Sequence, residues 1–269
     1  MSAPHVTADP WATLREVTAA RVGLGHAGVS LPTAVELDFR MAHARARDAV
    51  HRALDAAAVA AALAPAGLPV VRAHGAVRDR GEYLRRPDLG RRLDAASRAA
   101  LAGARPAAAD AVFVVADGLS ALAVERHAPP LLLRVAARLR AEGWALGPVA
   151  VVEQGRVAVG DEVGELLGAA LVAVLIGERP GLSAPDSLGV YLTFAPRPGR
   201  TDAERNCISN VRAEGLGYDL AAHRLAWMMT EARRRGLTGV GLREEAPPLP
   251  PGERPAVLGG GGAPDAAGR

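Results

Sequence analysis

The chain has 269 residues, of which 49% are apolar and 23% charged, as is typical of a soluble globular protein with one large domain or two small ones. A single cysteine, Cys207, excludes an internal disulfide framework and a metal site built from several cysteines. The longest apolar run, near residues 166–176, is too short to cross a bilayer. The first residues lack the pattern of a secretory signal, so we expect a cytoplasmic protein without a membrane partner.

All 32 basic side chains are arginines, but the formal net charge is only +3. Stretches such as RMAHARARDAVHRALD alternate arginine with alanine and acidic residues, which is typical of the solvent-facing side of a helix. Aromatic residues make up 3% of the chain and leave few rings for stacking on bases. We therefore expect no nucleic-acid partner, although an arginine-rich nucleic-acid binder stays an alternative.

Residues 1–10 are predicted to be a flexible lead-in, and residues 11–105 a mainly helical N-terminal region. The spacing of apolar residues predicts helices over 11–20 and over one long run, 33–64. Farther along, Asp88 is predicted to cap a helix that extends to about Gly103.

Gly23, Gly25 and Gly28 fit the G-x-G-x-x-G pattern of dinucleotide-binding proteins. No strand precedes these glycines, and Pro32 follows where a helix should already have begun. The motif therefore indicates a turn.

Strands and helices alternate over residues 106–245, which predicts an α/β domain. VAVVEQGRVAV indicates two strands joined by a hairpin at Gln154 and Gly155. This hairpin predicts a mixed, Rossmann-like sheet with flanking helices. Further strands are expected near 111–116, 171–177 and 190–196, and helices near 120–126, 129–143, 161–169 and 219–235. The proline- and glycine-rich residues 246–269 are predicted to be a disordered tail.

Two carboxylates, Asp117 and Glu178, follow predicted buried strands directly. Ligands of open α/β sheets bind outside the carboxyl ends of the strands, so both side chains lie where a site is expected. Composition alone leaves each of them open as a ligand contact, a helix cap or an ion-pair partner. No histidine lies near Cys207 in a recognisable catalytic motif, and no two histidines have metal-ligand spacing, so we expect neither a catalytic residue nor a metal site.

Five ordered segments resemble the small (light) subunit of ethanolamine ammonia-lyase, and the resemblance covers about residues 14–243. They are YLRRPDLGRRL, DGLSA, GRVAVGDEVGELLGA, LIGERPGL and ERNCISNVRAEGL. The resemblance implies an adenosylcobalamin-dependent lyase that converts ethanolamine to acetaldehyde and ammonia. It also implies a hetero-oligomer, in which a separate large subunit carries the radical chemistry and the small subunit closes over the cobalamin.

The resemblance implies three cofactor-binding residues, namely Val157 in GRV, Glu178 in GER and Cys207 in NCISN. It also implies that the cofactor keeps its own benzimidazole ligand, because none of the seven histidines lies in a D-x-H-x-x-G motif. The short lead-in argues against packaging in a bacterial microcompartment, which stays an alternative location to the cytoplasm. The alternative function is a free-standing α/β module that binds cobalamin or another small ligand without the lyase partner.

Overall fold

The structure is a computed structural model that describes residues 5–249. The first four residues of the predicted lead-in, and residues 250–269 of the predicted tail, lie outside the described residues. Within the described range, no helix is both long enough and apolar enough to cross a membrane.

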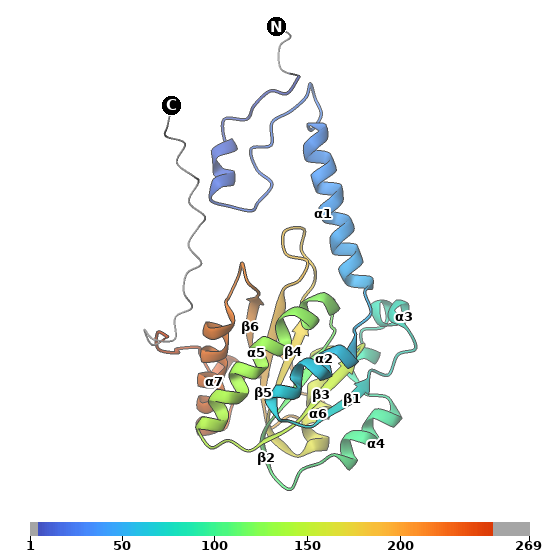
Figure 1. The fold of residues 1–269 in the computed structure, drawn as a ribbon, viewed down its shortest axis with the longest axis vertical. Coiled ribbons are helices and arrows are strands. Elements are labelled where there is room, and N and C mark those ends of the chain that lie inside the picture. Colours follow the sequence, from blue (N-terminus) through green and yellow to red (C-terminus); the bar gives the residue numbers. More distant parts are fainter. Residues whose placement is uncertain (1–4, 250–269) are drawn as a thin grey trace, which may run out of the picture.

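A six-stranded sheet in the order β1-β3-β2-β4-β5-β6 forms the centre of the molecule (Figure 1). The first four strands in this order are parallel, and β5 and β6 are antiparallel to their neighbours. The prediction of a mixed α/β sheet with flanking helices is confirmed. The strands are β1 (Val70–His74), β2 (Ala109–Ala116), β3 (Leu146–Glu153), β4 (Ala169–Gly177), β5 (Leu188–Phe194) and β6 (Arg205–Val211).

Helices cover both faces of this sheet, because alternate residues of the central strands point to opposite sides. Phe113 and Val115 of β2 pack with α2 (Ala56–Leu63), α5 (Ala121–Ala141) and α7 (Tyr218–Arg235). Val112 and Val114 pack with α4 (Ala95–Gly103) and α6 (Val159–Leu167) on the other face. The short helix α3 (Arg80–Arg85) lies beyond the end of β1.

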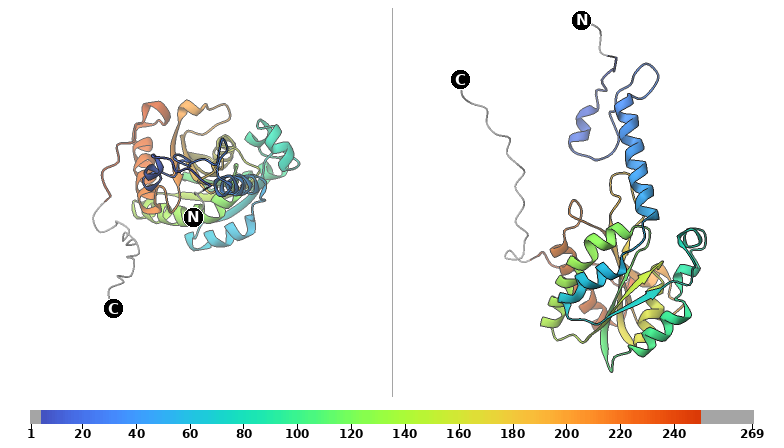
Figure 2. Two further views of the ribbon diagram at one scale, coloured as in Figure 1. Left: turned by 90° about the horizontal axis from the view of Figure 1, so that it is seen from above. Right: turned by 45° about the vertical axis from the view of Figure 1, so that its right-hand side comes forward.

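An N-terminal arm stands away from the sheet (Figures 1 and 2). It consists of a 3-10 helix, Ala12–Glu16, and α1 (Thr33–His51), and it exposes Leu37, Phe39 and Met41. The helix predicted over 33–64 is wrong as one element, because the backbone becomes extended at Arg52 and Asp55 caps a second helix, α2. Between the 3-10 helix and α1, all three glycines of the G-x-G-x-x-G pattern have positive φ, which confirms the predicted turn.

The predicted hairpin at Gln154 and Gly155 is wrong. Gln154 does turn the chain, with φ of 56°, but the chain then enters α6. β3 lies between β1 and β2 and pairs with both, so its two edges are occupied. The antiparallel part of the sheet comes instead from β4, β5 and β6, of which β6 was not predicted.

Two helix boundaries also differ from the prediction. α5 is one continuous helix that contains Pro129 and Pro130, whereas prolines were expected to begin a new helix there. α4 ends at Gly103 as predicted, but its cap is Asp94, which accepts a hydrogen bond of 2.7 Å from the Ser97 amide. Asp88 forms an ion pair with Arg86 instead. β1 comes from the region predicted to be mainly helical, so residues 11–105 and 106–245 share one sheet.

Candidate functional site

Asp117 follows β2 directly, and it is buried, with only 1% of its surface exposed. Its carboxylate accepts hydrogen bonds from the Gly155 amide (3.1 Å) and from Arg80 (3.2 Å). Burial raises the pKa of Asp117 to about 6, and the nearby Arg80 guanidinium offsets part of that rise. Of the roles left open by the sequence, the structure gives Asp117 that of an ion-pair partner inside the fold.

The same ion pair supports the loop that follows β3. Tyr83 is fully buried and donates a hydrogen bond of 2.9 Å to the carbonyl oxygen of Gly155. The guanidinium groups of Arg80 and Arg156 lie 4.6 Å and 4.2 Å from the centre of the Tyr83 ring. These contacts fix the loop that carries Val157.

Val157 is half-buried and lines a surface hollow of about 500 Å³, called here the arginine hollow. This volume lies within the range of small-molecule sites. Its lining includes Arg91, Arg156, Val157, Tyr191, Arg200 and Arg205.

Cys207 lies on β6, directly opposite Tyr191 of β5. Its side chain is exposed, and its Sγ lies 3.3 Å from the Ser209 hydroxyl. Burial, followed by the proximity of Cys207 and Glu178, raises the pKa of Tyr191 well above its usual range. Tyr191 therefore connects the hollow that Val157 lines with the strand that carries Cys207.

Glu178 follows β4, and its half-buried carboxylate lies beside Gly189 of β5, where a side chain would collide with it. One oxygen, Oε2, accepts hydrogen bonds from the Ser187 hydroxyl and, at 3.4 Å, from the Asn210 amide. The other oxygen, Oε1, accepts none from the described residues. Glu178 thus has one internally bonded oxygen and one that is left for another partner.

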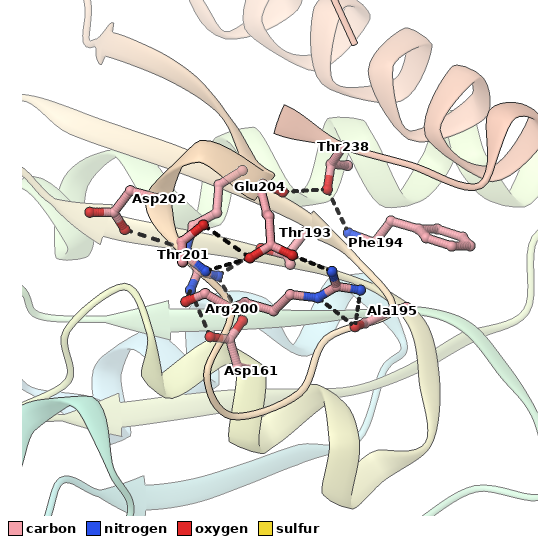
Figure 3. A network of polar contacts seen from close by, with 10 residues as sticks. Asp161, Thr193, Phe194, Ala195, Arg200, Thr201, Asp202, Glu204 and Thr238 are labelled. Carbon is pink, nitrogen blue, oxygen red and sulfur yellow. Dashed lines mark hydrogen bonds and ion pairs between the residues drawn. The ribbon is translucent and has the colours of Figure 1, made fainter. Parts of the chain in front are cut away.

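A polar network ties the antiparallel edge of the sheet to α6 (Figure 3). The Arg205 guanidinium donates two hydrogen bonds of 2.6 Å to Asp161 and one of 2.9 Å to Thr193. Arg200 forms an ion pair with Glu204, whose pKa is lowered to about 2, chiefly by the hydrogen bond from the Thr201 amide. This network forms one wall of the arginine hollow.

The structure thus brings all three residues near Tyr191: Val157 lines the same hollow, Cys207 lies opposite it in the sheet, and the charge of Glu178 acts on it. Sequence reasoning missed Tyr191, Arg156 and Arg205. The segment VYLTFAP predicted the strand that carries Tyr191, but nothing in it indicated the pairing with Cys207. Among residues 5–249, no group of three histidine, cysteine, aspartate or glutamate side chains could hold a metal ion.

Comparison with known proteins assigns the family. Residues 8–243 match the family model of the ethanolamine ammonia-lyase light chain (EutC). The chain belongs to this family. The match includes the N-terminal arm, the arginine hollow and all three residues carried over from the resemblance, and it confirms the resemblance itself.

Curated members of the light-chain family are similar over nearly their whole length. The ethanolamine ammonia-lyase small subunit of Ralstonia nicotianae is 59% identical over 258 residues, which cover 94% of this chain and 96% of the relative. The small subunit of Pseudomonas syringae pv. tomato is 59% identical over 89% of this chain and 84% of its own length. That of Pseudomonas fluorescens is 58% identical over 90% of each chain.

Proposed function

We propose that this chain is the small subunit of an adenosylcobalamin-dependent ethanolamine ammonia-lyase, which converts ethanolamine to acetaldehyde and ammonia. The observation that carries the proposal is the 59% identity to a named small subunit over 94% of the chain. The partner is the large subunit of the same enzyme, in a hetero-oligomer. We assign no catalytic residue to this chain.

Adenosylcobalamin, when bound between the two subunits, supplies the radical chemistry. We propose that Val157, Glu178 and Cys207 contact it from this side, with Tyr191 between them. The residues present suit such a group. Glu178 has an oxygen without an internal partner, which can accept from the amide side chains of a corrin, and Val157 and Cys207 offer small contacts. The hollow is smaller than a whole cobalamin, so the large subunit would cover the rest.

The role of this chain is then to bind and orient the cofactor and to exclude water from it. Glu178 accepts hydrogen bonds, and Tyr191, whose pKa is raised, keeps its hydroxyl proton as a donor. The ion pairs of Asp117 and Asp161 hold the Val157 loop and β6 in place.

The test is co-expression with a candidate large subunit. The purified complex should release ammonia from ethanolamine when adenosylcobalamin is added, and this chain alone should release none. Tight corrinoid binding by the isolated chain, without any complex, would favour the free-standing binding module instead. We place the complex in the cytoplasm, with a bacterial microcompartment as the alternative, and fractionation of cells grown on ethanolamine distinguishes the two locations.

A further inference from the structure

The arginine hollow carries more positive charge than the fold neutralises. Four arginines and a single carboxylate, Asp202, line it. Arg200 is paired with Glu204, and Arg205 with Asp161. Asp202 lies 3.6 Å from Arg205 as well, and its side chain is 97% exposed. The two remaining arginines, Arg91 and Arg156, have no ion-pair partner among residues 5–249.

The Arg156 side chain is held in place, but not all of its hydrogen-bond donors have an acceptor. Its guanidinium stacks on the Tyr83 ring at 4.2 Å, and one terminal nitrogen donates to the Tyr83 carbonyl at 3.4 Å. Its Nε is buried and has no hydrogen-bond partner. A buried donor without an acceptor is unfavourable, so contacts within this chain leave part of the hydrogen-bonding capacity of Arg156 unused.

The backbone places Arg91 beside Arg156. The Arg156 amide donates a hydrogen bond of 2.7 Å to the carbonyl oxygen of Gly90, which precedes Arg91. The first amides of α6, at the same place, already donate to the carbonyl oxygens of residues 156–158. The hydrogen-bond donors of the hollow that remain available to a ligand are therefore those of the arginine side chains.

Two arginines with unused donors suit a phosphate, because a guanidinium binds phosphate oxygens through two parallel hydrogen bonds. Tyr191 lines the same hollow, and a tyrosine hydroxyl is a further hydrogen-bond donor. A carboxylate ligand would use fewer of these donors, and a cation would be repelled.

We propose that Arg91 and Arg156 form a binding site for a phosphate group. Two sources have this chemistry, namely free phosphate and the phosphodiester that links the nucleotide tail of cobalamin to its corrin. The second source rests on the proposed function, and it is consistent with the position of Val157 next to Arg156 in the chain.

The experiment compares two corrinoids on the complex with the large subunit. Cyanocobalamin contains the nucleotide tail and its phosphate, and dicyanocobinamide lacks both. The variant carries R91Q and R156Q, and the matched control is R105Q, because Arg105 is an exposed arginine at the opposite ends of the strands, beside Gly168. Affinities are measured by spectroscopic titration, and a thermal melt checks that each variant folds.

We expect R91Q/R156Q to weaken cyanocobalamin binding by about tenfold to a hundredfold, through the loss of charge-assisted hydrogen bonds, and to weaken dicyanocobinamide binding much less. R105Q should change neither affinity. Calorimetric titration of the isolated chain with inorganic phosphate forms a second arm. If R91Q/R156Q weakens the binding of inorganic phosphate but not that of cyanocobalamin, the site binds free phosphate.

The proposal is overturned if R91Q/R156Q leaves the affinity for phosphate unchanged and, in addition, either weakens the binding of both corrinoids equally or weakens the binding of neither. A wild-type complex that binds neither corrinoid contradicts the proposed function. The calorimetric titration with inorganic phosphate then tests the phosphate site independently. The two failures are therefore distinguishable.

Discussion

The Arg205 guanidinium donates two hydrogen bonds of 2.6 Å to the two carboxylate oxygens of Asp161, and the two side chains are only 2% and 1% exposed. Arg205 begins β6, and Asp161 lies in the first turn of α6. The pair therefore fixes the antiparallel edge of the sheet, which carries Cys207, relative to the helix that follows Val157.

Asp161→Asn should lower the free energy of unfolding by about 3–5 kcal/mol, because it leaves the buried Arg205 charge without a buried carboxylate partner. Urea denaturation measures this loss. Asp202→Asn is the matched control, since Asp202 is also near Arg205 but almost fully exposed, and it should cost less than about 0.5 kcal/mol. Equal losses in the two variants would show that the buried pair has no special role.

Asp117 should make stability depend on pH in the direction opposite to that of an ordinary salt-bridged carboxylate. Its pKa is about 6 in the folded state and near 3.8 in the unfolded chain. The folded state therefore binds the proton more tightly, and this contribution to stability is complete below about pH 4 and is lost as the pH rises through 6. A difference of about two pKa units corresponds to about 3 kcal/mol.

Asp117→Asn removes this titration. We expect the free energy of unfolding of the wild type, minus that of the variant, to fall by about 2–3 kcal/mol between pH 4 and pH 7. Urea denaturation of both proteins across this range measures it, and the subtraction removes the other carboxylates. A difference that stays constant or rises with pH would contradict the assignment.

Glu178→Gln tests the proposed cofactor contact. The amide oxygen can still accept from Ser187 and Asn210, so the melting temperature should change little. Corrinoid affinity of the complex should weaken by about tenfold to a hundredfold, because a charged acceptor is lost. Ser187→Ala is the control, and it should lower the melting temperature more than the affinity. If Glu178→Gln changes the affinity less than about twofold but lowers the melting temperature, Glu178 is structural.

Cys207 provides a direct probe, because it is the single cysteine of the sequence and its side chain is exposed. A maleimide should label the isolated chain once. In the complex with bound cobalamin, labelling should be slower by at least about tenfold, since access limits the reaction. Unchanged labelling in that complex would place Cys207 outside the cofactor interface.

The sequence predicted most helices and the central strands, because their apolar residues recur with clear periods, as in LVAVLIG of β4. The errors arose where distant residues decide the local structure. Gln154 and Gly155 form a turn, but Gly155 bonds to Asp117, and the next amide, that of Arg156, bonds to Gly90. β6 was missed because its sequence, RNCISNV, is polar and its edge position leaves one side exposed.

The continuity of α5 through Pro129 and Pro130 has a similar cause. Proline normally interrupts a helix, because it lacks an amide proton and collides with the preceding turn. In α5, the residues on either side of the prolines, including Val124, Leu131 and Leu132, are fully buried in the core. This packing outweighs the local preference.

The candidate site could be predicted only in part from the sequence. Val157, Glu178 and Cys207 were assigned by resemblance, and no spacing in the sequence indicates that they lie around Tyr191. That arrangement follows from the register of β5 and β6, which brings Tyr191 opposite Cys207. Register is a property of pairs of strands, and the pattern within a single strand does not reveal it.

The strand order of the sheet has a consequence for the synthesis of the chain. Within residues 5–249, β3 is the one strand that pairs with β1, and the ribosome makes α4, β2 and α5 before β3 emerges. β1 therefore has no strand to pair with while the nascent chain lengthens. The parallel part of the sheet can form only when β3 has been made and pairs with both β1 and β2. Such nonlocal pairing slows folding and prolongs the exposure of apolar strands.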